Sequence, residues 1–164
     1  MELRSVEELM DLLHACRGAR GTACAGGAPV DLHDHALQTA ALLRRSRPAD
    51  KELQVAGLVH VIGQLSRPGD LAGRADHAAG AVRPLLGERV SLLVRLHRED
   101  RVREPAVHRP VMDEPVIDDV MDDALILRQA DESARTAGLD AGVLEDWRTV
   151  LELVSARHTR LGAP

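Results

Sequence analysis

The chain has 164 residues, of which 45% are hydrophobic and 29% are charged, with a formal net charge of −5. It contains one tryptophan and no phenylalanine or tyrosine, so we expect a core of leucine, valine, isoleucine and alanine. This composition favours helices. General affinity for nucleic acid would need a basic surface, and the sequence has no dense cluster of lysine and arginine. No apolar run approaches the roughly 18 residues that would cross a membrane.

The two cysteines, Cys16 and Cys24, are too few for a disulfide framework. With no signal-peptide pattern, they predict a cytoplasmic protein whose thiols are reduced and structural. As partners we expect a small-molecule substrate, and neither nucleic acid nor a membrane. The oligomeric state stays open.

Apolar residues recur with helical spacing along most of the chain, so we predict one all-α domain over residues 1–164. Its core would cover about 31–135, after an N-terminal helix and a glycine-rich loop in 1–30. A C-terminal helix would occupy 140–157. Ser5 and Glu8 form a capping-box pattern, and Asp31 is placed to cap the second helix. The bundle of about six to seven helices would comprise 5–17, 31–47, 49–65, 70–84, 88–101, 116–137 and 141–157.

Prolines mark two places where this helical pattern should break. Pro84 lacks an N–H group and is expected to kink or end the fourth helix. Residues 103–115 contain three prolines and predict a long loop, of the kind that often forms a lid or the wall of a site.

Several histidines and one aspartate fall beside apolar stripes on different predicted helices. His60 lies in a strongly apolar run, so its ring should face inward and need a polar partner. Helical bundles build central metal sites from inward ligands on separate helices, and histidine with carboxylate suits iron, zinc or manganese. Taken singly, each residue is better explained as an ordinary core or surface side chain. The set is His35, His60, His77, His97 and Asp131.

Three segments carry a family resemblance. They are a His-x-x-Gln-Thr-Ala pattern from His35 to Ala40, the run Val55 to His60, and the run Leu127 to Asp131. In their order and residue types they resemble the HD-domain superfamily. The closest-looking branch is the HD-type mixed-valent di-iron oxygenases, which cleave organophosphonates and are related to myo-inositol oxygenase. The match covers about residues 31–135.

The resemblance implies an HD-type helical fold and an iron cofactor with one or two ions, or manganese or another divalent metal. It also implies that two basic residues hold the phosphonate. They are Arg101, four places after His97, and Arg128, three places before Asp131. Surface ion pairs would explain the same two arginines. The implied metal ligands are His35, His60, His77, His97 and Asp131, and the implied substrate-binding residues are Arg101, Arg128, Gln64 and Gln38.

The chain differs from this branch at two motif positions. Val61 replaces the aspartate that bridges two metals, and valine has no lone pair to donate, so a bridged pair of ions should be weakened. Gln64 replaces a histidine that contacts substrate there. The remaining two histidines and one carboxylate are the ligand set of mononuclear non-haem iron oxygenases. His77 and His97 would then be remnants of a second metal site, acid–base groups in catalysis, or ligands to a weaker metal.

Three functions follow from these observations. The first is an iron-dependent oxygenase acting on a small polar or anionic, phosphonate-like substrate. The second is a metal-dependent phosphohydrolase, in which an ion lowers the pKa of the attacking water. The third is a degenerate HD domain that has lost catalysis and serves as a binding or regulatory module, as the loss of the bridging aspartate suggests.

Overall fold

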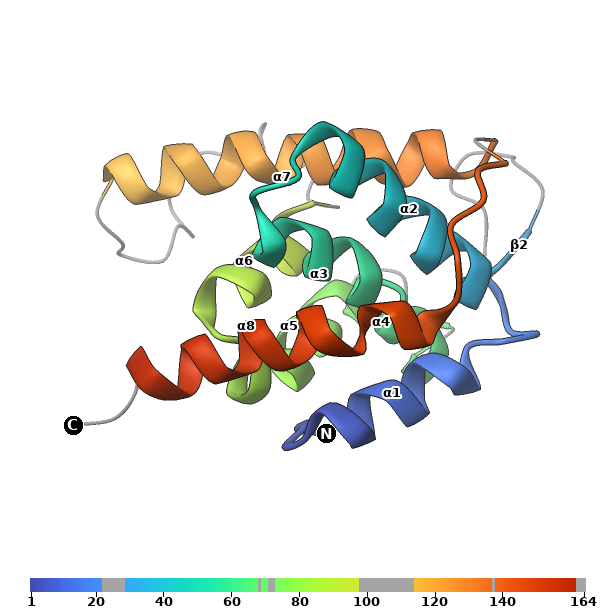
Figure 1. Ribbon diagram of the computed structural model, residues 1–164, viewed down its shortest axis with the longest axis horizontal. Coiled ribbons are helices and arrows are strands. Elements are labelled where there is room, and N and C mark those ends of the chain that lie inside the picture. Colours follow the sequence, from blue (N-terminus) through green and yellow to red (C-terminus); the bar gives the residue numbers. More distant parts are fainter. Residues whose placement is uncertain (22–28, 68, 71–72, 98–113, 137, 162–164) are drawn as a thin grey trace.

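The computed structural model is built from helices, with one very short β-ladder (Figure 1). It describes residues 1–21, 29–67, 69–70, 73–97, 114–136 and 138–161, without the side chains of 114–118. The prediction of a single all-α domain is confirmed. The elements are α1 (Val6–Ala15), β1 (Arg20–Gly21), β2 (Val30–Asp31), α2 (Leu32–Ser46), α3 (Lys51–Val59), α4 (Ile62–Ser66), α5 (Arg74–Leu86), α6 (Glu88–Leu96), α7 (Glu114–Ala134), the 3-10 helix η4 (Leu144–Trp147) and α8 (Arg148–Leu161).

The helices α1 and α2 begin at the capping residues that the sequence indicates. The Ser5 hydroxyl accepts a hydrogen bond from the Glu8 N–H, while the Glu8 carboxylate accepts from the N–H of Arg4 rather than of Ser5. Asp31 caps α2 by accepting from the Asp34 N–H. A side-chain oxygen at this position satisfies an N–H that has no partner within the helix.

The helix expected over 49–65 is divided in two, and this is a correction to the sequence analysis. The helix α3 ends at Val59 and α4 begins at Ile62. The His60 ring lies across the junction, and its Nδ1–H donates to the Gly57 carbonyl oxygen at 2.6 Å. In a continuous helix that carbonyl would accept from Val61 instead. The side chain therefore competes with the backbone for the acceptor and ends the helix.

Pro84 does not interrupt its helix as expected. It lies inside α5, which continues to Leu86 and ends at Gly87, where φ is +94°. Proline removes one hydrogen bond to the carbonyl four residues earlier, which belongs to the exposed Gly80. Because Gly80 lies at the surface, water can satisfy its carbonyl and the helix persists.

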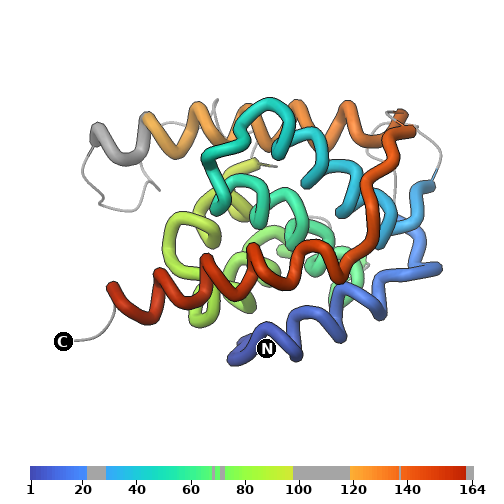
Figure 2. Tube along the Cα trace, viewed as in Figure 1, coloured from blue at the N-terminus to red at the C-terminus, as the bar shows by residue number. Residues whose placement is uncertain are grey.

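The helix α3 is the centre of the molecule. It packs against α2, α6, α7 and α8, and its residues 53–59 are all buried. In the view of Figure 2, α7 and α2 lie above it and α1 lies at the bottom. The glycine Gly57 allows α2 to approach, since a methyl group there would lie 2.5 Å from Leu43 Cδ1. Any polar side chain that α3 carries inward therefore meets the neighbouring helices within the core.

The remaining features lie at the edges of the fold. Residues of β1 and β2 form an antiparallel pair that closes the expected loop between α1 and α2. The predicted proline-rich loop at 103–115 lies outside the described residues up to 113, and Pro115 falls in the first turn of α7. Among the described helices, none has both the length and the apolar character needed to span a membrane.

Candidate metal centre

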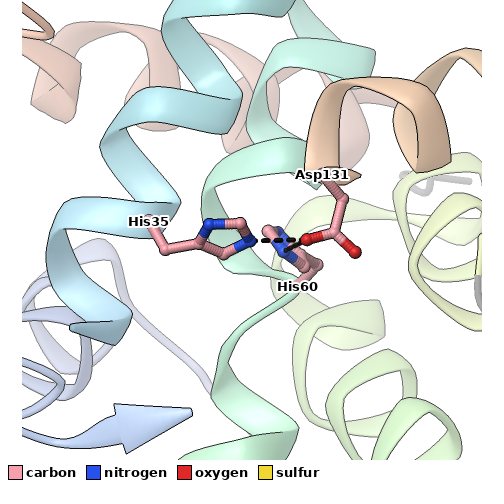
Figure 3. Close-up of side chains that lie close together, drawn as sticks. All are labelled: His35, His60 and Asp131. Atoms are coloured by element: carbon pink, nitrogen blue, oxygen red, sulfur yellow. Dashed lines mark hydrogen bonds and ion pairs between the residues drawn. The ribbon is translucent and has the colours of Figure 1, made fainter. Parts of the chain in front are cut away.

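Two histidines and one aspartate from three helices meet in the core (Figure 3). His35 comes from α2, His60 from the end of α3 and Asp131 from α7, and all three side chains are buried. The Nε2 atom of His35 lies 2.5 Å from Asp131 Oδ1, and Nε2 of His60 lies 3.3 Å from the same oxygen. These three residues offer ligand atoms within 4.8 Å of one another, so the cluster could hold a metal ion.

His97 lies beside this group. It caps the C-terminus of α6, and its Nε2 lies 3.9 Å from the second carboxylate oxygen, Asp131 Oδ2. The His97 ring meets the His60 ring edge-on with centroids 5.2 Å apart, and the His35 and His60 rings are 5.4 Å apart in a similar arrangement. His60 thus stands between two further imidazoles, and Asp131 faces all three.

The backbone sets the orientation of two of these rings. The Nδ1–H of His60 donates to the Gly57 carbonyl, and the Nδ1–H of His97 donates to the Val94 carbonyl at 2.7 Å. In both cases the ring bonds to the residue three positions earlier at the end of its helix. In the neutral ring, a proton held on Nδ1 leaves the lone pair on Nε2, the nitrogen that faces Asp131. This is the arrangement by which proteins prepare neutral histidine to ligate metal.

His35 lacks such a backbone partner. Its Nδ1 is buried without a hydrogen bond to any residue that the structure describes. The short contact to Asp131 therefore needs the proton on Nε2, which donates to the carboxylate. Binding of a metal at this nitrogen would displace that proton, as metal binding to protonated ligands generally does.

The charge balance of the cluster also favours a cation. Burial alone would raise the pKa of Asp131, but attraction to His60 and the hydrogen bonds from both histidines outweigh it and hold that pKa far below its usual range. Burial lowers the pKa of His35, and the hydrogen bond to Asp131 offsets this only in part. The carboxylate therefore stays ionised although it is buried, and a buried anion needs a positive partner, a role that a divalent ion could fill.

His77 does not belong to the described group of ligand atoms around Asp131. It stands on α5, and its side chain is half-buried. Burial lowers its pKa, with smaller contributions from the positive charges of Arg67 and the N-terminus. Its roles as metal ligand and catalytic group stay predictions.

Val61 stands where the resemblance expects a bridging carboxylate, and its side chain is fully buried within the apolar core. The position next to His60 therefore contributes packing and no metal ligand.

The expected substrate-binding residues are placed in different surroundings. The side-chain amide of Gln38 donates to the Leu139 carbonyl oxygen and accepts from the Leu139 N–H. These two hydrogen bonds connect α2 to the segment after α7. Gln64 is buried on α4, and its Oε1 has no hydrogen bond to any described residue. The Arg128 side chain is 40% exposed on α7 and pairs with Glu132 at 3.4 Å. Arg101 lies outside the described residues.

A second group of possible ligands lies at the start of α2, formed by Asp31, His33 and Asp34. Asp31 caps the helix there and also accepts from the Gly18 N–H at 2.6 Å, so its carboxylate is already engaged. Asp34 is largely exposed. These contacts account for the group as the structural start of a helix.

Two features of the centre were missed in the sequence. The carbonyls of Gly57 and Val94, which orient His60 and His97, belong to residues without polar side chains. Only their shared spacing, three residues before a histidine that ends a helix, could have pointed to them. Arg74 is buried against Gly63 of α4 and was not singled out either, although a buried arginine is rare.

No protein-family model matches this chain, and no curated protein matches it. The chemistry of the centre is therefore argued from its own residues.

Proposed function

We propose that this chain is an HD-type, iron-dependent oxygenase that acts on a small polar or anionic, phosphonate-like substrate. The observation that carries the proposal is the convergence of His35, His60 and Asp131 on one point in the core. Two histidines and one carboxylate are the usual ligands of mononuclear non-haem iron, and they leave positions open for substrate and O₂. The resemblance of residues 31–135 to the HD-type oxygenases supports the same activity.

Within this proposal, each residue of the centre has a task. Asp131 supplies the negative charge that retains the ion, and His60 presents a lone pair because its proton is held by the Gly57 carbonyl. The three ligand residues are buried, and buried apolar residues of α3 belong to the same core. Bound iron would supply the activation of O₂, while the protein would limit access to a substrate small enough to enter.

The fully buried Val61 favours a second possibility, a domain that keeps the histidines but no longer catalyses. The same donors also suit zinc or manganese, so a phosphohydrolase would use this centre in a similar way. The three functions differ in what they consume: O₂ with substrate, a phosphoester with water, or nothing.

The test is reconstitution of the purified protein with Fe²⁺ under anaerobic conditions, followed by measurement of O₂ uptake with a panel of small phosphonates and polyols. We expect substrate-dependent O₂ uptake that Asp131→Asn abolishes and His14→Ala retains, because His14 is an exposed histidine of α1 outside the centre. A phosphoester screen with Mn²⁺ or Co²⁺ runs in parallel. Release of phosphate without O₂ uptake, or iron binding without either reaction, would contradict the oxygenase proposal.

A further inference from the structure

We infer that His97 is a ligand of the same single ion as His35, His60 and Asp131, giving a centre of three histidines and one carboxylate. This rests on the proposed metal centre and specifies its ligand set and its capacity. The inference goes beyond the group of three residues whose ligand atoms already lie close together.

The orientation of His97 supports this role. Its Nδ1–H donates to the Val94 carbonyl at 2.7 Å, so the lone pair is on Nε2, and that atom lies 3.9 Å from Asp131 Oδ2. His60 has the same arrangement, with a carbonyl three residues earlier and Nε2 toward Asp131. Two helices thus end with a histidine turned in the same way toward one carboxylate. The bonds to the carbonyls satisfy the buried Nδ1–H groups, and they leave both Nε2 atoms directed at the carboxylate.

The two oxygens of Asp131 join the histidines into one centre. Oδ1 faces His35 and His60, and Oδ2 faces His97. The edge-on ring contacts of 5.4 Å and 5.2 Å place His60 between the other two imidazoles. An ion held by this carboxylate is therefore close to all three rings, and a modest movement of His97 would bring its Nε2 into the coordination sphere.

A second ion at His97 is poorly supported by the residues that the structure describes. Among the described residues it would have only His97 and one oxygen of Asp131 as ligands, whereas catalytic zinc sites have three protein ligands. The neighbouring position that would add a carboxylate is Val61, which is apolar and fully buried. His77 does not belong to the described cluster. The donors available suit one ion with four ligands better than two ions with two or three each.

The experiment is titration of the full chain with Co²⁺, which binds at iron and zinc sites and whose visible absorption reports its ligands. We expect one Co²⁺ per chain in the native protein. His97→Ala should keep that stoichiometry, weaken binding by about 10- to 100-fold or more, and change the absorption spectrum. The control is His14→Ala, which removes an exposed histidine of α1 that pairs with Glu145 outside the centre. It should leave both affinity and spectrum unchanged.

Three results would overturn the inference, and they separate its failure from that of the proposed function. Equal Co²⁺ affinity and spectrum in His97→Ala would show that His97 is not a ligand, while the oxygenase proposal would stand. Two ions in the native chain and one in His97→Ala would show a dinuclear centre. No binding by the native chain would reject both proposals. If His97→Ala does not fold, X-ray absorption of the Co²⁺-loaded native protein counts the imidazoles directly: three support the inference and two refute it.

Discussion

Gly63 is the glycine whose replacement should disturb the metal centre most directly. It lies three residues after His60 in α4, and it packs against the start of α5. A methyl group added there would lie 2.0 Å from the Arg74 carbonyl oxygen and 2.7 Å from the carbonyl carbon. Real side-chain carbons essentially never approach within 3.0 Å. The obstacle is backbone, which cannot rotate away, so α4 and α5 would have to separate by about 1 Å.

The size of the effect follows from two opposing contributions. Forcing extra volume into a packed contact costs about 1–3 kcal/mol, and a backbone obstacle favours the upper end of that range. Alanine in place of glycine within a helix recovers about 0.5–1 kcal/mol. We therefore expect Gly63→Ala to lower the free energy of unfolding by about 2 kcal/mol. For a chain of this length that corresponds to a fall of about 4–8 °C in Tm.

The assay is thermal unfolding followed by circular dichroism, together with Co²⁺ affinity. The matched control is Gly80→Ala, since Gly80 lies in α5 and nothing would lie within 4 Å of the added methyl group. That variant should be more stable than the native protein by about 0.5–1 kcal/mol. Gly63→Ala should also bind Co²⁺ more weakly, because a displacement of α4 would also move His60, which lies just before that helix. A Gly63→Ala protein as stable as Gly80→Ala would refute the packing assigned to this junction.

Three further predictions concern charge and protonation. Arg89 donates to both oxygens of Asp50 and to Asp123, so Arg89→Met should destabilise the fold by about 2 kcal/mol in denaturant titrations at pH 7. Burial raises the pKa of Asp50, but the hydrogen bonds from Arg89 outweigh it and keep that pKa below its usual value. The stabilisation by the Arg89–Asp50 pair is therefore present above about pH 4, and it is lost as the pH falls through the pKa of Asp50 in the folded protein. The difference between the native protein and Arg89→Met should therefore shrink in acid, and a constant difference would contradict this account. Burial, with the nearby Asp31, raises the pKa of the Cys16 thiol to about 12, so its peptide should stay unmodified by iodoacetamide at pH 8 until the protein is unfolded. Co²⁺ affinity should fall as the solution is made more acidic, because protons compete with the ion for the ligand atoms, and isothermal titration at several pH values would measure this.

Most of the fold was predictable because it rests on local signals. Ser5 and Asp31 cap the helices they were expected to cap, and apolar spacing located the main helices. The errors arose where a side chain competes with the backbone. The division of the third helix depends on the His60 ring bonding to Gly57, and hydropathy alone does not encode that contact. Pro84 was overestimated as a helix breaker because its cost depends on which carbonyl loses its partner.

The centre was predictable only in part, for a related reason. His35, His60 and Asp131 were expected together, and the fold brings them together. Their separation in sequence is bridged by the packing of α2, α3 and α7, which periodicity does not specify. His77 stays a prediction, since its position one turn into a helix looked equally suitable and the described group of ligand atoms does not include it. Identity of residue type predicts capacity to bind, whereas the angle between helices decides which side chains meet.

The number of carboxylates at the centre leads to a last prediction, about the charge of the substrate. A divalent ion held by uncharged histidines and Asp131 alone leaves a net charge of about +1 in an apolar core, since Val61 adds no second carboxylate. A buried positive charge is costly unless an anion balances it, so we expect the centre to bind small monoanions more tightly than neutral ligands of similar size. Azide should therefore change the visible spectrum of the Co²⁺-loaded protein at lower concentration than imidazole does. Val61→Asp would add the missing negative charge and should remove that preference. If azide and imidazole bind alike in the native protein, or Val61→Asp leaves the preference intact, the charge at the centre is not what selects the ligand.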